Sequence, residues 1–385
     1  MMRRPGLWVL TTVLAISACA PAQRPAGGDE SPSSGASPEQ GVELLSLADA
    51  TRAEAGRQYT HTRLITGRAP GGRFRAPLAL TPRGELVVST FGRNASGPHS
   101  FAVEIVGSHG VSKKVPIPAD HPASNGITRM AAGPRWLVWQ TAESRDLLQD
   151  QWVLWSFDRQ RNHLLRLAKA PKTVSGHYPR LPLDSPPAVT SQGRVFVSAA
   201  RERRKGKFRL SVESIPAGGG VLRFEEAGTA PFLGRDRLVW ASSGTGPPRV
   251  QERSPLFRGP AGSLFAAGSN CERGLGLTAA GDTTAWAVQC GPRATVAVAS
   301  RGEVIAEIRV PLTVGHLAAT SRFVSFSTGS GPYRIFVFDL DERHLYEVGG
   351  KNLGGETFVA GSDLAWVEFD AAPPTPGTVR LITWR

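Results

Sequence analysis

The sequence predicts an all-β fold in which one strand–turn–strand unit recurs seven times. Proline and glycine are abundant along the whole chain, with 30 and 43 of the 385 residues, which is typical of many short strands joined by turns. A short apolar strand, a tight polar turn and a second strand with a large apolar residue near its centre also recur in order from Leu78 to Trp366.

The large residue of each second strand marks the repeat. These residues lie at intervals of 40 to 57 positions: Val87, Trp139, Phe196, Trp240, Trp286, Phe326 and Trp366. A four-stranded propeller blade takes about 40 to 50 residues, and the two longer intervals leave room for longer loops. The spacing predicts a seven-bladed β-propeller over residues 58–385 rather than a pair of β-sandwiches, with the large residues packed between neighbouring blades.

Two repeats carry an aspartate at the end of their third strand. Asp158 follows the strand 152–157 and precedes the strand 163–168, and Asp339 follows 334–338 and precedes 344–348. The pattern resembles the blades of TolB-like propellers, a class with WD-like architecture, where a strand ends in an aspartate-bearing turn before the outer strand begins. The resemblance implies a propeller and, more loosely, a platform for protein interactions.

The ring requires a closing strand. The last repeat has three strands before the C-terminus, the last of them at 378–384, and an isolated strand-like segment at 59–66 precedes the first repeat. We expect residues 59–66 to pair antiparallel with residues 378–384 and so to close the ring.

The first 18 residues predict a signal peptide. Arg3 and Arg4 precede an apolar run of 12 residues that ends at Ala18, which is shorter than the roughly 20 residues of a membrane-spanning helix. The sequence from Ile16 to Cys19 resembles the bacterial lipobox. The resemblance implies that Cys19 receives a diacylglycerol, that the chain is cut before it, and that the new amine is often acylated, with palmitate as an expected acyl group. The alternative is an ordinary signal peptide cut near Ala18 or Ala20.

A tether is expected over residues 19–57. Residues 20–41 contain mainly Ala, Pro, Gly, Ser and Gln, a composition that cannot bury enough apolar surface to order itself; residues 42–56 form either a short helix or more tether. The protein is then expected on the extracytoplasmic face of the cell membrane. Because Ala20 rather than Asp follows the cysteine, the outer membrane is open to it if the host has one.

The charge and the cysteine content limit which binding partners and cofactors are expected. The net charge of +13 fits nucleic acid in a cytosolic protein, but export excludes that partner and leaves anionic lipid, anionic polymer or an envelope protein. The alternative is that the many arginines, and so the positive charge, simply reflect the codon usage of a GC-rich genome. Cys271 and Cys290 predict a disulfide, because two isolated thiols lack the further ligands of a zinc site. We expect a monomer without a cofactor.

The chain lacks the common catalytic motifs, and we assign no catalytic residue. A ligand ring is conceivable where the innermost strands begin, at the mouth of the channel: Asn125, Asp184, Arg273, His316 and Glu356. Its mixed charges disfavour a metal. The sequence therefore favours a binding or scaffolding module in the cell envelope, with a propeller-type hydrolase or lyase at the channel mouth as the alternative.

A cationic loop is the second candidate site. Five cations lie within seven residues, between strands 195–199 and 208–212: Arg201, Arg203, Arg204, Lys205 and Lys207. The loop is expected on the same face as the channel mouth. It either contacts an anionic surface or is an ordinary solvated hairpin.

Overall fold

The computed structural model describes residues 41–385 except 69–73, 92–101, 108–109, 118–126, 143–150, 174–185, 205, 236, 243–248, 254–261, 267–270, 312, 330–332 and 370–376. Residues 41–385 form one compact unit. The predicted signal peptide, Cys19 and residues 20–40 of the predicted tether lie outside the described residues.

Antiparallel strands follow one another in groups of four, and strand order within a group is chain order except in the last group, whose outer strand comes from the N-terminal part of the chain. Group 1 contains β4 (Phe74–Leu80), β5 (Leu86–Phe91), β6 (Ala102–Val106) and β7 (Ser112–Val115). Group 2 contains β8 (Ile127–Ala132), β9 (Trp136–Ala142), β10 (Trp152–Asp158) and β11 (His163–Lys169). Group 5 contains β19 (Cys271–Ala280), β20 (Thr283–Cys290), β21 (Arg293–Ser300) and β22 (Glu303–Val310).

Two long strands each serve two successive groups. Strand β15 (Arg223–Leu233) ends group 3, which begins with β12 (Ala188–Val189), β13 (Arg194–Arg204) and β14 (Lys207–Pro216), and then starts group 4 with β16 (Leu238–Ser242), β17 (Arg249–Arg253) and β18 (Gly262–Ala266). Strand β26 (His344–Ala360) likewise ends group 6, which contains β23 (Val314–Ala319), β24 (Phe323–Thr328) and β25 (Tyr333–Asp339), and starts group 7 with β27 (Asp363–Glu368) and β28 (Thr378–Trp384).

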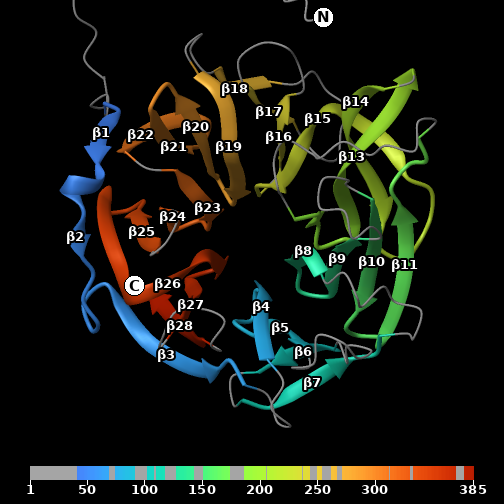
Figure 1. Ribbon diagram of the computed structural model, residues 1–385, viewed down its shortest axis with the longest axis horizontal. Coiled ribbons are helices and arrows are strands. Elements are labelled where there is room, and N and C mark those ends of the chain that lie inside the picture. Colours follow the sequence, from blue (N-terminus) through green and yellow to red (C-terminus); the bar gives the residue numbers. More distant parts are fainter. Residues whose placement is uncertain are drawn as a thin grey trace, which may run out of the picture. The chain divides into compact units, whose positions relative to one another are not determined.

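The first strands of the groups contact one another around a ring. β4 contacts β8, the contacts continue through β12, β15, β19, β23 and β26, and β26 returns to β4 (Figure 1). The core consists of separate clusters of buried apolar residues, one between each pair of neighbouring groups. The protein is therefore an all-β propeller, and its strand pairings are compatible with the seven blades that the sequence predicts.

The predicted column of large residues is confirmed. Its members lie on the second strands β5, β9, β13, β16, β20, β24 and β27, and all are at most 2% exposed. Trp139 lies in a cluster with Val87 of the preceding group, and Trp240 in a cluster with Phe196. These side chains fill the space between neighbouring sheets, as expected for a packing role.

The predicted ring closure is also confirmed. Strand β3 (Tyr59–Thr66) pairs antiparallel with β28, from Thr66 opposite Thr378 to Tyr59 opposite Trp384. Ile65 of β3 is 6% exposed and packs in the cluster between groups 7 and 1. The outer strand of group 7 thus comes from the N-terminal part of the chain.

The segment before β3 belongs to the propeller, which differs from the predicted tether over 19–57. Strand β1 (Glu43–Ser46) pairs parallel with β22, and β2 (Thr51–Arg52) pairs parallel with β26. Between them lies one short 3-10 helix, Leu47–Asp49, whose N-cap is Ser46. Leu47 is 8% exposed and joins the cluster between groups 5 and 6, so these residues are held by pairing and by burial.

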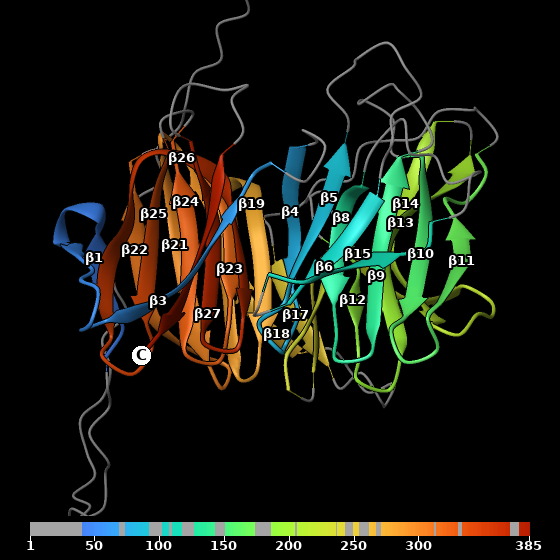
Figure 2. The same ribbon diagram turned by 90° about the horizontal axis from the view of Figure 1, so that it is seen from below.

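The ring has two ends that are formed by different connections between strands. The turns from first to second and from third to fourth strands lie at one end, which we call the turn face, together with Arg385 (lower edge in Figure 2). At the other end, the connection face, each first strand begins. Neighbouring turns contact each other across groups: Arg322 donates to the Ser362 hydroxyl at 3.4 Å, and the Arg235 amide donates to the Gly281 carbonyl at 2.7 Å.

Candidate functional site

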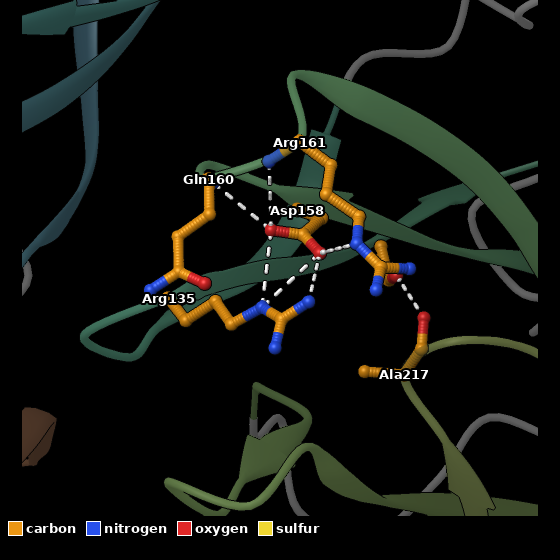
Figure 3. A network of polar contacts seen from close by, with 6 residues as sticks. Arg135, Asp158, Gln160, Arg161 and Ala217 are labelled. Carbon is orange, nitrogen blue, oxygen red and sulfur yellow. Dashed lines mark hydrogen bonds and ion pairs between the residues drawn. The ribbon is translucent and has the colours of Figure 1, made fainter.

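Asp158 organises the turn between β10 and β11 (Figure 3). Its Oδ1 accepts from the amides of Gln160 at 2.9 Å and Arg161 at 3.2 Å, and Arg135 Nε lies 3.1 Å from both carboxylate oxygens. Hydrogen bonding from Arg135 lowers the pKa of Asp158 to about 2. A carboxylate held in this way is a fixed anion of the scaffold.

Asp339 repeats the arrangement in group 6. Its Oδ1 accepts from the amides of Asp341 and Glu342, both at 2.9 Å, and its Oδ2 accepts from the Trp384 indole at 2.6 Å. The residues before the outer strands, Asn162 and Arg343, both have positive φ angles, of 53° and 51°. The two aspartates that the sequence singled out therefore stabilise equivalent hairpins, and Asp339 also ties group 6 to group 7.

Buried glutamates hold group 3 together. Glu213 is fully buried and pairs with Arg201, whose Nη2 donates to Oε2 at 2.7 Å. Glu225 is 8% exposed and accepts from Arg194 at 2.5 Å and from the Ser214 hydroxyl at 2.6 Å. Burying a carboxylate without such partners would carry a large desolvation penalty, so these contacts make the burial tolerable.

The buried carboxylates among the described residues thus all have a structural role, because each is paired with another group of the propeller. In group 1, Glu104 lies 3.5 Å from Arg75, and the others are Asp158, Glu213, Glu225 and Asp339. Each has a partner within its own group or in the next one. The sequence indicated the two aspartates by their repeat positions, but it gave no sign of the arginines that pair with the glutamates.

Three of the five predicted channel-mouth residues lie on described strands. Arg273 is on β19, His316 on β23 and Glu356 on β26, and these first strands are neighbours in the ring. Glu356 is exposed. Asn125 and Asp184 lie outside the described residues, so a ring of five ligands stays a prediction.

His316 is held by the neighbouring strand. Its Nδ1 lies 3.2 Å from the Thr357 hydroxyl and 3.4 Å from the Thr357 amide nitrogen, which donates to it. The same hydroxyl lies 3.2 Å from that of Ser325. This polar row joins groups 6 and 7, and its members Ser325 and Thr357 are fully buried.

The predicted cationic loop is the tight hairpin between β13 and β14, which lies at the connection face because it joins second to third strand. Two of its residues serve the hairpin itself: Arg201 pairs with Glu213, and Glu202 accepts from the Gly206 amide at 2.7 Å. Arg203, Arg204 and Lys207 are exposed, while Lys205 lies outside the described residues. Contact between these cations and an anionic surface stays a prediction.

The predicted disulfide is present. Cys271 and Cys290 are bonded to each other and lie directly opposite on β19 and β20. The bond fixes the end of group 5 that lies at the connection face, two residues before Arg273 on β19.

Within the part of the chain that the structure describes, no three His, Cys, Asp or Glu side chains gather closely enough to hold a metal ion. No helix among those residues combines the length and apolar character needed to cross a membrane.

Comparison with known proteins shows the fold alone. The β-propeller domain of the Trilobed protease from Pyrococcus furiosus matches with a TM-score of 0.56 and 8% identity, over 81% of this chain and 93% of that one. An uncharacterized protein from Listeria monocytogenes matches with a TM-score of 0.50 and 7% identity, over 76% and 88%.

A peptidase gives a partial match. Acylaminoacyl peptidase from Pyrococcus horikoshii has a TM-score of 0.53 and 11% identity, over 83% of this chain. The chain spans about half (52%) of that peptidase. No protein-family model matches the chain, and no curated protein is similar to it in sequence.

Proposed function

We propose that this chain is a lipid-tethered protein of the cell envelope whose seven-bladed propeller binds another envelope component. One observation carries the binding role: the buried carboxylates of the described residues all stabilise turns, strands or junctions between groups. The acidic groups thus build a rigid frame, and exposed loops on a rigid frame are where binding sites commonly lie.

The lipid tether rests on the sequence from Ile16 to Cys19 and on its position after an apolar run of signal-peptide length. Several acyl chains on Cys19 give stable anchoring where a single chain does not. The disulfide between Cys271 and Cys290 agrees with a location outside the reducing cytosol.

We place the partner-binding region on the connection face, with the exposed cations Arg203, Arg204 and Lys207 as its charged contact. Guanidinium groups bind carboxylates and phosphates in a bidentate manner, so the partner should present negative charge. This placement of the binding region is supported by the exposure of these three side chains at the end of a paired hairpin.

Metabolic labelling tests the tether. The full chain, produced in a bacterium that processes lipoproteins, should incorporate radioactive palmitate and sediment with membranes, whereas Cys19→Ala should do neither. Label retained in Cys19→Ala, or an unlabelled soluble wild type, would refute lipidation.

Partner binding is tested by capture from envelope extracts. Arg203→Gln/Arg204→Gln/Lys207→Gln should retain at least tenfold less of the specific wild-type partner, and Arg309→Gln, an exposed arginine on the outer strand of group 5, should retain it fully. Equal capture by both variants would refute the hairpin as the contact.

The alternative function is a hydrolase at the channel mouth. It is favoured by His316 and the exposed Glu356, which lie on the neighbouring first strands β23 and β26. A panel of ester, lactone and acyl-peptide substrates tests it: turnover by the wild type that His316→Ala and Glu356→Gln both abolish would establish the enzyme.

A further inference from the structure

We infer that the turn face of the propeller docks on anionic phospholipid headgroups, so that the connection face points away from the membrane. The inference rests on the proposed lipid tether at Cys19 and adds an orientation to it. Three observations carry it: where the chain joins the propeller, how much chain precedes that point, and which charges surround it.

The chain joins the propeller at the turn face. β1 runs parallel to β22, with Glu43 opposite Ala306 and Ser46 opposite Arg309. β22 starts directly after the turn Arg301–Gly302, so Glu43 is the end of β1 nearer that turn. The described chain therefore begins, at Gly41, at the edge of the turn face.

The chain between Cys19 and Gly41 is short compared with the propeller. Its composition predicts a flexible coil, for which 21 residues give a root-mean-square span of about 25 Å. An eight-residue strand such as β20 adds about 26 Å between the two faces. A lipid on Cys19 thus brings the turn face within ordinary reach of the bilayer, whereas docking by the connection face requires the coil to run about 26 Å back along the outside of the ring.

The turn face is basic. Its described turns carry exposed arginines from five different places around the ring: Arg57, Arg83, Arg161, Arg235 and Arg301. The side chains of Arg161, Arg235 and Arg301 are 79%, 73% and 86% exposed. The exposed carboxylates of the same turns are Glu54, Asp341 and Glu342, and the side chain of Asp282 is 40% exposed, so five arginines face four acids among these turns.

Two of these arginines sit around a single acid. Arg235 and Arg301 approach Asp282 Oδ2 to 4.0 and 3.9 Å, and their amides are fixed by the carbonyls of Gly281 and Asp282. The turns are thus preorganised while the guanidinium groups extend into solvent. Headgroup phosphates accept two hydrogen bonds from each such group, and several arginines near an anionic surface add their attraction.

Reconstituted vesicles test the orientation. The full lipidated protein is bound to vesicles of neutral phosphatidylcholine, or of the same lipid with about 30% phosphatidylglycerol, and floated. An arginine-selective reagent is then applied, and modification at each arginine is measured by mass spectrometry. On anionic vesicles we expect Arg57, Arg83, Arg161, Arg235 and Arg301 to react at least tenfold more slowly than on neutral ones, and Arg203 and Arg204 to react equally on both.

Two triple variants test which arginines contact the anionic membrane. Arg83→Gln/Arg235→Gln/Arg301→Gln should still float but lose the protection of Arg57 and Arg161, and the hairpin variant Arg203→Gln/Arg204→Gln/Lys207→Gln should keep it. Molar salt should remove the protection without detaching the protein. Protection of the hairpin instead of the turns, or equal reactivity on both vesicles, overturns the inference, whereas failure to float on neutral vesicles refutes the lipid tether itself.

Discussion

At the scale of single residues, the Asp158 carboxylate satisfies two kinds of donor at once. Its Oδ1 closes the turn by accepting two backbone amides, and both oxygens face the Arg135 guanidinium. An amide side chain of the same shape would keep an acceptor for the turn but would lose the charge that Arg135 pairs with. The two contributions can therefore be separated by one substitution.

Asp158→Asn should lower the free energy of unfolding by about 1 to 2 kcal/mol near pH 6, because it removes the charge of a buried carboxylate that is hydrogen-bonded to the partly exposed Arg135. The pKa of Asp158 is lowered from 3.8 to about 2, so its contribution is complete above about pH 4 and is lost as the pH falls toward 2. Urea unfolding of both proteins at several pH values measures this. Asp341→Asn, at an exposed site of the equivalent turn, is the control; a wild-type advantage that stays constant down to pH 2 would contradict the assignment.

At the scale of elements, β15 shows how one strand can serve two sheets. Its pairing passes from β14 at Ala227 to β16 at Gly228. Gly228 has a φ of 154°, and a Cβ there would lie 2.3 Å from the Ala241 carbonyl oxygen and 2.4 Å from Trp240 Cδ1. The bend between groups 3 and 4 therefore depends on the missing side chain.

Gly228→Ala should destabilise the protein by about 2 to 4 kcal/mol, because both the backbone angle and the close contacts oppose a methyl group. Gly218→Ala is a matched control in group 3, since a Cβ at that position meets nothing within 4 Å. Thermal unfolding followed by circular dichroism compares the three proteins. Equal midpoints for Gly228→Ala and the wild type would show that the bend tolerates a side chain.

The elements that the sequence predicts are those that repeat. Trp139, Trp240 and Trp366 could be found because buried residues recur at a constant place in each unit. β1 and β2 carry no such signal, since they are short and lie outside the repeat. The contacts that stabilise the predicted site could not be predicted either. The contact from Asp339 to Trp384 joins residues 45 positions apart, and nothing in the sequence around one residue specifies the other.

At the scale of the whole molecule, β3 makes the ring depend on both ends of the described chain. Ile65 is buried between groups 7 and 1, whereas its neighbour Leu64 is 60% exposed on the opposite side of the same strand. Substitutions at these two positions therefore distinguish the effect of losing the buried contact from the effect of any change in this strand.

Ile65→Asp should lower the midpoint of thermal unfolding by about 10 °C or more, because it places a charge in an apolar cluster and loosens the closing strand. Leu64→Asp should leave the midpoint nearly unchanged. Loosening should also expose the edge of β28, which favours self-association, so size-exclusion chromatography should show oligomers for Ile65→Asp alone. Equal behaviour of the two variants would mean that β3 is dispensable for closure.

The outer position of the N-terminal strands also sets an order of events during synthesis. β1, β2 and β3 leave the ribosome first, but their partners β22, β26 and β28 leave among the last. These three strands must wait unpaired while the intervening sheets form, and such long-range pairing slows folding. These three strands are therefore the last of the described strands to be fixed in the ring.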